Sequence, residues 1–309
     1  MNPRFGRRSV LALAAAGALA SALPACSVAK GDEPEELAEY GYDPDVPEPG
    51  TVETPGRGAK VPPVASVRAA WLPPVGRQTM PNCFVWASVY GLATFFAARK
   101  SQRPPTTPDR QAGADYAYIR SEMANKIADK TCHGGQITKC LNWLRSNGGT
   151  PSLAAAPNYL RRGPTTSCDV NWSEYGSQTI PPDPSFNIPE YKVTTITGQG
   201  GLNNLRAILA SGMPIAYGTS LYTDFAHYRG TPAPYVGNGQ WVQNRRTGKG
   251  AGHVMLIVAY NDAYSPKSGA VRVQNSFGTS WGDNGFVWIA YDALEAMAQG
   301  RGVYIPVSA

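Results

Sequence analysis

The sequence has few histidines and cysteines and no dense basic run. It contains 3 histidines and 5 cysteines among 309 residues, and their spacings do not match those of zinc sites. Because no dense run of Lys and Arg with interleaved aromatic residues occurs, nucleic-acid binding is not expected. The uncharged, apolar stretch of residues 9–25 is too short and too rich in alanine for a comfortable membrane span. The 42% of hydrophobic residues is normal for a chain with a globular core.

The first 26 residues have the features of a bacterial export signal. Arg4, Arg7 and Arg8 precede the uncharged stretch, and the Arg7-Arg8 pair fits a twin-arginine signal. Leu23-Pro24-Ala25-Cys26 is similar to a lipobox, in which the cysteine is lipidated and holds the mature chain on the membrane. Cleavage after Ala22 is the alternative and would leave a soluble, secreted protein. We expect a protein exported from a bacterial cell, either lipid-anchored through Cys26 at the outer face of the membrane or secreted.

Residues 27–60 are predicted to be a disordered, acidic and proline-rich tether. Between residues 31 and 54 the chain has nine Asp and Glu and almost no aliphatic residues, so it cannot bury enough apolar surface to offset its ordering entropy. The alternative is a short prosegment that lies over a functional cleft. From residue 55 onward, 24 Lys and Arg against 13 Asp and Glu leave a net charge of +11. That charge would favour anionic surfaces or acidic substrates, or it serves only solubility.

Cys83 begins a long helical pattern. Apolar residues recur at helical spacing from Val85 to Phe96, and Asn82 is a residue type that commonly caps a helix N-terminus. The first turn of a helix presents free N–H groups and the positive end of the helix dipole, which favour a thiolate over a thiol. The position of Cys83 is therefore suited to a nucleophile.

Two later motifs supply a base and a group to orient it. His253 opens the apolar segment 253–260, and Asn275 leads the motif Asn-Ser-Phe-Gly-Thr-Ser-Trp-Gly-Asp-Asn-Gly. A cysteine, an imidazole and an amide that fixes the imidazole are the parts of a thiol hydrolase. The other histidine in a loop, His227, is interpreted as a surface residue.

Together these motifs resemble the papain-like cysteine peptidases, the family of papain and the cathepsins. The resemblance implies an α+β fold over residues 61–309, with a helical lobe (about 75–195) that contains the central helix and an antiparallel, β-rich lobe (about 196–309). The active site is expected in the cleft between the lobes. The implied activity is hydrolysis of peptide bonds by a thiolate–imidazolium pair of Cys83 and His253, oriented by Asn275. The substrate is then a peptide or protein, no cofactor or metal is needed, and we expect a monomer.

The resemblance also assigns an oxyanion-binding role to Gln78. Its side-chain amide would join the backbone N–H of Cys83, although only four residues separate the two, one fewer than is usual in the family. Pro81 lies inside that shortened loop, and Met80 stands where the family commonly has a cysteine.

Four residues are predicted to contact substrate on the same basis. Gly134 and Gly135 resemble the Cys-x-Gly-Gly turn whose backbone runs alongside bound peptide, and a tight turn before a helix is the alternative. Phe277 occupies a position where the family has Trp and would shield the bond between His253 and Asn275 from water. Trp281 is the fourth residue predicted to contact substrate.

The resemblance leaves the disulfides open, because Met80 removes one partner of the family's bridge. The remaining cysteines are Cys132, Cys140 and Cys168. A bridge from Cys168 to Cys132 is predicted, with Cys140 as the alternative partner.

Other segments carry only structural patterns, and two further functions stay open. Helices are expected over 111–127, 136–146, 201–212 and 292–298, strands over 213–219, 253–260, 270–275, 286–291 and 303–307, and an irregular crossover over 153–196. The same Cys–His pair could perform acyl transfer or amide hydrolysis on cell-wall peptides. A non-enzymatic binding module would tolerate loss of the pair.

Overall fold

A computed structural model describes residues 41–42, 48–124, 134–156, 179–243, 252–264 and 269–307. The chain divides into two units between Glu35 and Glu36, and every described residue belongs to the second unit. Across these described segments, no helix combines the length and the apolar character that crossing a bilayer requires.

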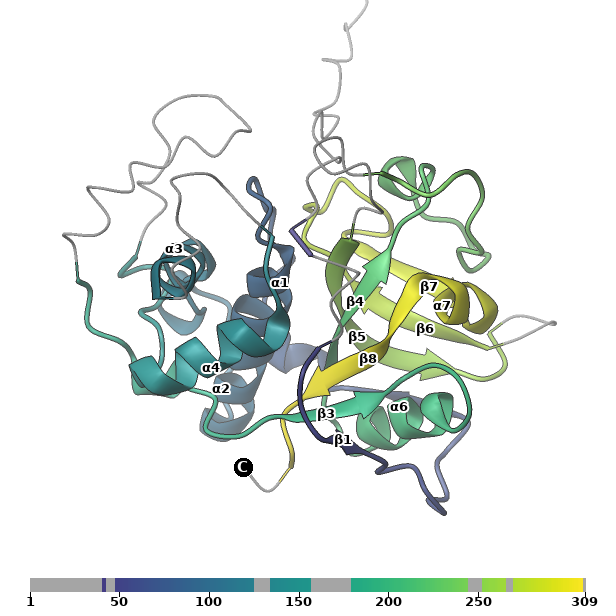
Figure 1. The fold of residues 1–309 in the computed structure, drawn as a ribbon, viewed down its shortest axis with the longest axis horizontal. Helices are drawn as coiled ribbons and strands as arrows, with labels where there is room; N and C mark the ends of the chain where they lie inside the picture. Colours follow the sequence, from purple (N-terminus) through teal and green to yellow (C-terminus); the bar gives the residue numbers. More distant parts are fainter. Residues whose placement is uncertain are drawn as a thin grey trace, which may run out of the picture. The chain divides into compact units, whose positions relative to one another are not determined.

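The helices before residue 150 lie together beside the sheet (Figure 1). One continuous helical stretch consists of α1 (Cys83–Val85), the π-helix η3 (Trp86–Ala93) and α2 (Thr94–Ser101). Its residues up to Ala98, apart from Trp86, are buried, as expected for a helix that is apolar around its whole circumference. The helices α3 (Ala114–Ala124) and α4 (Ile137–Asn147) pack against this stretch and against each other.

Eight described strands form one sheet, in the order β1-β3-β8-β4-β5-β6-β7 with β2 also paired to β5. All pairs are antiparallel except β1 with β3. The central strand β5 is buried along nearly its whole length, which explains its unbroken apolar sequence. The strand bounds are β1 (Val52–Glu53), β2 (Val64–Ser66), β3 (Lys192–Thr195), β4 (Ile215–Ser220), β5 (Gly252–Asn261), β6 (Ala270–Gln274), β7 (Phe286–Ala290) and β8 (Ala298–Tyr304).

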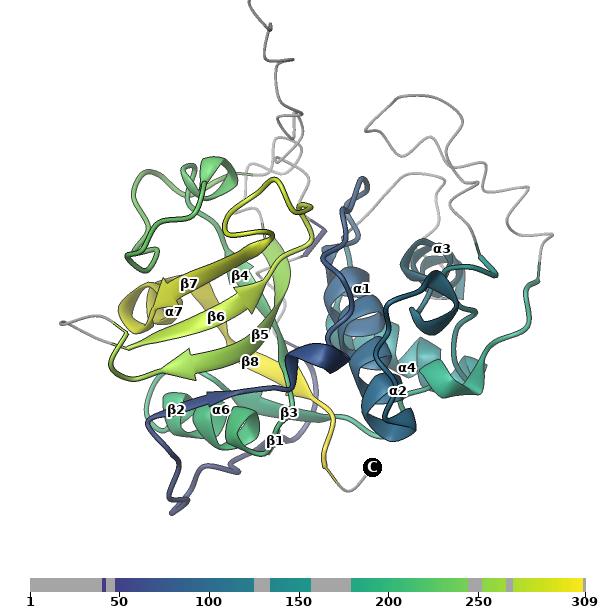
Figure 2. The same ribbon diagram turned by 180° about the vertical axis from the view of Figure 1, so that it is seen from behind.

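Helices α6 (Gly201–Ala210) and α7 (Tyr291–Met297) lie beside the sheet (Figure 1). The predicted α+β architecture, a helical part and a mainly antiparallel sheet, is therefore confirmed. Figure 2 shows how β2 and the short 3-10 helix η2 (Ala69–Trp71) carry the chain from the sheet to α1. The ring of Trp71 packs edge-on against Phe95, with 5.9 Å between the ring centroids.

Several predicted boundaries are wrong. The helix expected over 111–127 starts only at Ala114, because Ala112 pairs with Ser152 as an isolated β-bridge. The boundary expected between the lobes at residue 195 cuts off β3, which belongs to the sheet. The last strand is β8, not 303–307.

The predicted tether is also wrong over its described C-terminal part. Val52 and Glu53 form β1 and pair with β3. Glu48 is 1% exposed and accepts hydrogen bonds from the backbone N–H groups of Ile137 and Thr138 at the start of α4. Composition missed these contacts because they use backbone groups and one buried carboxylate rather than apolar side chains. The rest of the predicted tether, apart from residues 41 and 42, lies outside the described residues.

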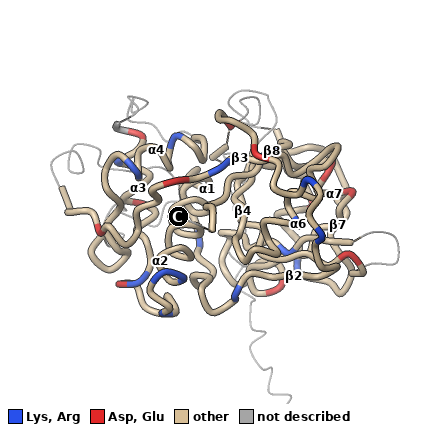
Figure 3. Tube along the Cα trace, turned by 90° about the horizontal axis from the view of Figure 1, so that it is seen from below, with Lys and Arg blue, Asp and Glu red and all other residues tan. Residues whose placement is uncertain are grey.

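Charged residues are interspersed along the trace (Figure 3). Basic and acidic positions alternate over helices and sheet in this view, without one block of a single sign. The net positive charge of the folded part is thus distributed and does not by itself mark a binding surface.

Candidate active site

Cys83 is the first residue of α1 and is fully buried. Its sulfur lies within hydrogen-bonding reach of the backbone N–H groups of Phe84, Val254 and Gly41. Phe84 belongs to the first turn of the helix, and Val254 follows His253 on β5. The thiol thus lies beside the backbone of Val254, the residue that follows the predicted histidine and is 171 residues away in the sequence.

Asn82 does not cap this helix with its side chain, contrary to the prediction. Its Nδ2 donates to Oδ1 of Asp115 on α3 at 3.0 Å, while its backbone oxygen accepts from Val85 and Trp86. The side chain is drawn away because Asp115 offers a buried acceptor from a distant helix. This interaction joins α3 to the residue that precedes the thiol.

His253 and Asn275 are hydrogen-bonded in the interior. Nε2 of His253 lies 2.8 Å from Oδ1 of Asn275, and both residues are buried. An amide oxygen only accepts, so Nε2 carries the proton and donates. Nδ1 is then the ring nitrogen that can exchange a proton with a thiol.

The position of Asn275 is fixed by its own neighbours. Its backbone N–H donates to the carbonyl of Gly285, and its Oδ1 also accepts from the backbone N–H of Ser276 at 2.8 Å. The amide oxygen is therefore oriented before it meets the imidazole.

Phe277 covers the imidazole. The two rings are stacked, with centroids 4.7 Å apart and planes inclined by 27°. The predicted shielding of the bond between His253 and Asn275 is consistent with this contact. Trp281 is 3% exposed, donates its Nε1–H to the carbonyl of Phe225 and packs edge-on against Phe277. It supports Phe277 from the interior, which does not fit its predicted contact with substrate.

The Gln78 side chain is held by the loop that contains Asn275. Its Oε1 accepts from the hydroxyl of Ser276 at 2.5 Å, and its Nε2 donates to the carbonyl of Met80 at 3.2 Å. The backbones join as well, because Gln78 N–H donates to the carbonyl of Ser276 and Arg77 pairs with Phe277. One hydrogen of the amide NH₂ is thus engaged within the shortened loop.

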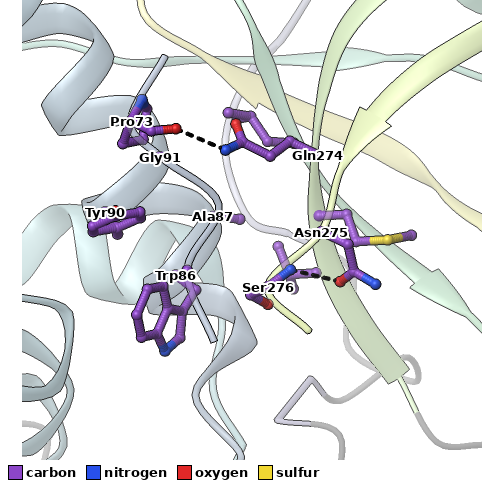
Figure 4. Close-up of a pocket in the computed structure, with 12 residues that line it drawn as sticks. Pro73, Trp86, Ala87, Tyr90, Gly91, Gln274, Asn275 and Ser276 are labelled. Carbon is purple, nitrogen blue, oxygen red and sulfur yellow. Dashed lines mark hydrogen bonds between the residues drawn. The ribbon is translucent and has the colours of Figure 1, made fainter. Parts of the chain in front are cut away.

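A small pocket lies behind Asn275, between η3 and the ends of β5 and β6 (Figure 4). Trp86, Tyr90 and Gly91 line it from the helix, and Gln274 spans it by donating to the carbonyl of Pro73 at 2.9 Å. Neither Cys83 nor His253 lines this pocket. It is a packing gap between helix and sheet rather than the place where substrate would meet the thiol.

The backbone of Gly135 is paired with the chain's own N-terminal part. Gly135 N–H donates to the carbonyl of Gly41 at 2.8 Å, and Tyr42 forms bridges with both Gly135 and Gly252. A side chain at Gly134 would also meet this segment, since a Cβ there would lie 2.6 Å from the carbonyl carbon of Gly41. The two glycines predicted to run alongside a peptide thus have a peptide segment beside them.

Comparison with known proteins decides the family. Residues 122–304, more than half of the chain, match the family described as "Papain family cysteine protease". The chain belongs to this family. The match contains His253 and Asn275 and begins after Cys83, whose assignment therefore depends on the geometry above.

Individual papain-family relatives are distant. The chain is 27% identical to ananain of Ananas comosus over 161 residues, which are 52% of this chain and 39% of ananain. Among solved structures, xylellain, a cysteine protease from Xylella fastidiosa, superposes with a TM-score of 0.58 at 21% identity, over 87% of this chain and 96% of that one. Procathepsin B S9 from Trypanosoma congolense gives a TM-score of 0.55 at 12% identity, over 83% and 81% of the two chains. At these identities the structures show a shared papain-like fold.

Burial shifts the pKa values of Cys83 and His253 toward the uncharged forms of both groups. Burial raises the pKa of the Cys83 thiol to about 12, although the surrounding N–H groups lower it. Burial likewise lowers the pKa of His253 to about 4, against the opposing effect of the bond to Asn275. Burial of the two groups therefore works against the expected thiolate–imidazolium pair, which stays a prediction.

The cysteine predictions are only partly covered by the structure. Cys140 on α4 is buried and free, which removes it as the alternative disulfide partner. Cys26, Cys132 and Cys168 lie outside the described residues, so the predicted bridge stays a prediction. Where the structure is described, no cluster of His, Cys, Asp and Glu could hold a metal ion.

Two residues beside Cys83 were missed by sequence reasoning. They are Tyr42, which lies between Gly135 and Gly252, and Gly218 on β4, against which the Tyr42 ring packs. The sequence contained one indication of Tyr42, because Tyr40 and Tyr42 are the only aromatic residues of the acidic stretch 31–54. Nothing in the sequence indicated a special position for Gly218, since a glycine in a strand has many structural explanations.

Proposed function

We propose that this chain is a cysteine peptidase in which Cys83 attacks the carbonyl carbon of a peptide bond. The observation that supports the proposal is the convergence of Cys83 and the hydrogen-bonded pair of His253 and Asn275 at the contact of α1 with β5. Taken alone, Cys83, His253 and Asn275 could each serve only the fold. A thiol at a helix N-terminus beside an oriented imidazole is, however, the arrangement that nucleophilic catalysis needs.

The acylation step uses atoms that the geometry assigns. Nδ1 of His253 takes the proton of the thiol, while Nε2–H stays bound to Asn275. The sulfur then bonds to the carbonyl carbon, and the imidazolium returns its proton to the leaving amine. A water molecule activated by the same imidazole hydrolyses the thioester.

The oxyanion is stabilised by two donors. The backbone N–H of Cys83, one of the free N–H groups in the first helical turn, is one of them, and the second Nε2 hydrogen of Gln78 is the other. Ser276 positions Gln78 and also lies next to Asn275, so one loop supports both the base and the oxyanion donor.

The proposal is tested with an epoxide reagent for thiol peptidases and a peptide library. The reduced protein is expected to take up one equivalent of reagent on Cys83, followed over hours because the thiol is buried, and to cleave the library. Cys83→Ala abolishes both, whereas Cys140→Ala, which removes the other described thiol, leaves both unchanged. A folded, reduced protein that neither labels nor cleaves would instead be a binding module, and cleavage of purified peptidoglycan alone would indicate cell-wall chemistry.

We also propose that the protein is exported and lipidated on Cys26. The sequence supports this through the twin-arginine pair and the lipobox-like residues before that cysteine. Expression in a bacterial host should place the protein in the membrane fraction, and Cys26→Ser should move it to the soluble fraction. A wild-type protein that is already soluble after export would support cleavage after Ala22 instead.

A further inference from the structure

Two aromatic rings form an exposed stack on the loop that follows β4. The rings of Tyr222 and Trp241 have centroids 3.9 Å apart and planes inclined by only 20°. Tyr222 is half-buried, whereas Trp241 is 42% exposed. Because Tyr222 covers only one face of the indole, the rest of the indole surface is open to a second flat partner.

The backbone around the stack is ordered by a short two-stranded ribbon. Tyr222 and Trp241 pair as an antiparallel bridge. The next hydrogen bond runs from Thr223 N–H to the carbonyl of Gln240 at 2.9 Å. Gly237, with a φ of 75°, turns the chain tightly against the Tyr222 ring, since a Cβ there would lie 2.4 Å from its Cε2 atom. The rings are thus held in place before a ligand arrives, which lowers the entropic cost of binding.

The stack lies near the proposed catalytic histidine. In the register of β4 and β5, Thr219 pairs with His253, and Tyr222 is three residues farther along the chain. At about 3.3 Å per residue, this spacing puts the backbone of Tyr222 within about 10 Å of that pair. Figure 1 shows the loop beyond the end of β4. A ligand of several units that rests on the stack could therefore extend to Cys83.

The chain around Trp241 is uncharged and rich in amides. No charged residue occurs from residue 230 to residue 244. Asn238, Gln240 and Gln243 are exposed, and their amide groups both donate and accept hydrogen bonds. The hydroxyl and acetamido groups of sugars need both kinds of partner, while the C–H face of a sugar ring packs flat on an aromatic ring. A nucleic acid would instead require cations around the stack.

We propose that the stack of Tyr222 and Trp241 binds sugar rings, and that it selects peptide substrates that carry a glycan. The second half depends on the proposed peptidase function, because it places the peptide part of the substrate at Cys83. The first half does not, since the rings can bind a sugar whether or not the thiol reacts. Cell-wall polymers combine N-acetylated sugars with short peptides, and the proposed export would bring the protein to them.

A peptide segment is the competing occupant, because an aromatic side chain also stacks on indole. The exposed amides favour the sugar, since each sugar ring has several hydroxyl groups at its rim, whereas the ring of a phenylalanine has none. A glycan would therefore use both the flat surface of Trp241 and the polar groups around it.

Binding of the tetramer of N-acetylglucosamine by the reduced, full-length protein tests the site. The probe is neutral and contains no peptide, so neither a cationic segment nor the reactivity of Cys83 accounts for its binding. In calorimetric titration, Trp241→Ala should bind at least about tenfold more weakly than the wild type, because tryptophan is among the residues whose truncation costs most at binding sites. Val236→Ala, which removes a 67% exposed apolar side chain of the same loop, should bind like the wild type.

A measurement on the wild type keeps the test decisive if Trp241→Ala folds poorly. Oxidative labelling of Trp241 by hydroxyl radicals, followed by mass spectrometry, should fall when the tetramer is added. Labelling of Trp288, a half-buried residue of β7 stacked on Tyr264, should not change. Unchanged labelling of Trp241 at a saturating concentration of the tetramer would overturn the site without any variant.

A glycosylated peptide tests the second half of the proposal. We compare kcat/KM for a peptide that carries an N-acetylglucosamine oligomer with kcat/KM for the same peptide without the sugar. The ratio should be at least about ten in the wild type and in Val236→Ala, and it should fall toward unity in Trp241→Ala. A ratio near unity in the wild type would overturn the selection of glycosylated substrates.

The outcomes separate this inference from the proposed function. Equal binding of the tetramer by wild type and Trp241→Ala, or no binding by either, would overturn the sugar site even if the wild type cleaves peptides. Protection of Trp241 by a phenylalanine-containing peptide but not by the tetramer would overturn it in favour of a peptide. Tetramer binding that depends on Trp241, without cleavage of any peptide, would support the sugar site and overturn the peptidase.

Discussion

Single hydrogen bonds decide which atoms at the Cys83 site can take part in chemistry. The bond from Nε2 of His253 to Asn275 leaves Nδ1 for the thiol, and the bond from Ser276 to Gln78 turns the amide so that its NH₂ group points toward Met80. These bonds come from one short loop, residues 275–277, which therefore sets the orientation of both the base and the oxyanion donor.

The role of Gln78 can be separated from that of the thiol. We expect Gln78→Ala to lower kcat for peptide hydrolysis about a hundredfold, the effect of losing one oxyanion donor. The rate of Cys83 alkylation should change little, because alkylation passes through no oxyanion. Both rates are measured with Gln102→Ala, an exposed glutamine at the end of α2, as the matched control. A fall in both rates would mean that Gln78 only supports the fold.

The start of α4 shows how one element depends on a distant segment. Glu48 supplies the acceptor for Ile137 and Thr138, so the N–H groups of this helix end are satisfied by a residue 89 or more positions earlier. A carboxylate is the favoured partner there because of the helix dipole. The start of α4 thereby holds Glu48, which is six residues after Tyr42, in place.

The contact of α3 with α4 buries a second carboxyl group, that of Glu122. Burial raises the pKa of Glu122 to about 7, although Lys139 lowers it. Protonation is therefore favoured by folding, and the stability from this group is complete below its ordinary pKa of 4.5 and is lost as the pH rises through about 7.

Urea unfolding at several pH values measures this effect. Between about pH 4.5 and 8, we expect the wild type to lose about 3 kcal/mol of unfolding free energy relative to Glu122→Gln. Glu190→Gln, which changes an exposed ion pair with Lys192, should follow the wild type. Parallel curves for wild type and Glu122→Gln would show that Glu122 titrates normally. Cys140 and Glu48 interact with this region and are left unchanged in every variant.

The sequence correctly predicted those segments whose structure depends on residues close by in the chain. His253 and the helix after Cys83 were found from sequence because each lies in an element with a clear apolar pattern. Asn275, one residue after the end of β6, was found from the motif that it opens. Asn82 was misread because a buried acceptor 33 residues later outcompetes the cap. The prediction for residues 41–60 was wrong because composition describes only the average of a segment. The described part of this segment is instead held by individual contacts of Gly41, Tyr42 and Glu48.

At the scale of the whole molecule, the N-terminal segment and the two halves of the catalytic site form one assembly. Gly135, two residues before α4, and Gly252 on β5 both pair with Tyr42, which joins the helical part to the sheet. The state of the nucleophile should therefore depend on a residue outside the catalytic set.

The pH dependence of Cys83 alkylation should report this dependence. Because alkylation follows the thiolate fraction and burial raises the pKa of Cys83 to about 12, the wild-type rate should still be rising above pH 9. In Tyr42→Ala, water and a chargeable His253 lower the thiol pKa, so the half-maximal rate should occur at a pH lower by about 1 or more. Tyr191→Ala, which removes a half-buried tyrosine bonded to Asn142, serves as the control. Identical profiles for wild type and Tyr42→Ala would show that the segment does not govern the thiol.

The pairing of β1 with β3 and the seat of Glu48 on α4 have one more consequence. They hold residues 48–53 against α4 and the sheet, while Tyr42 pairs with Gly135 and Gly252. One proteolytic cut between these positions would leave the enzyme whole and free the upstream piece, including any lipid on Cys26.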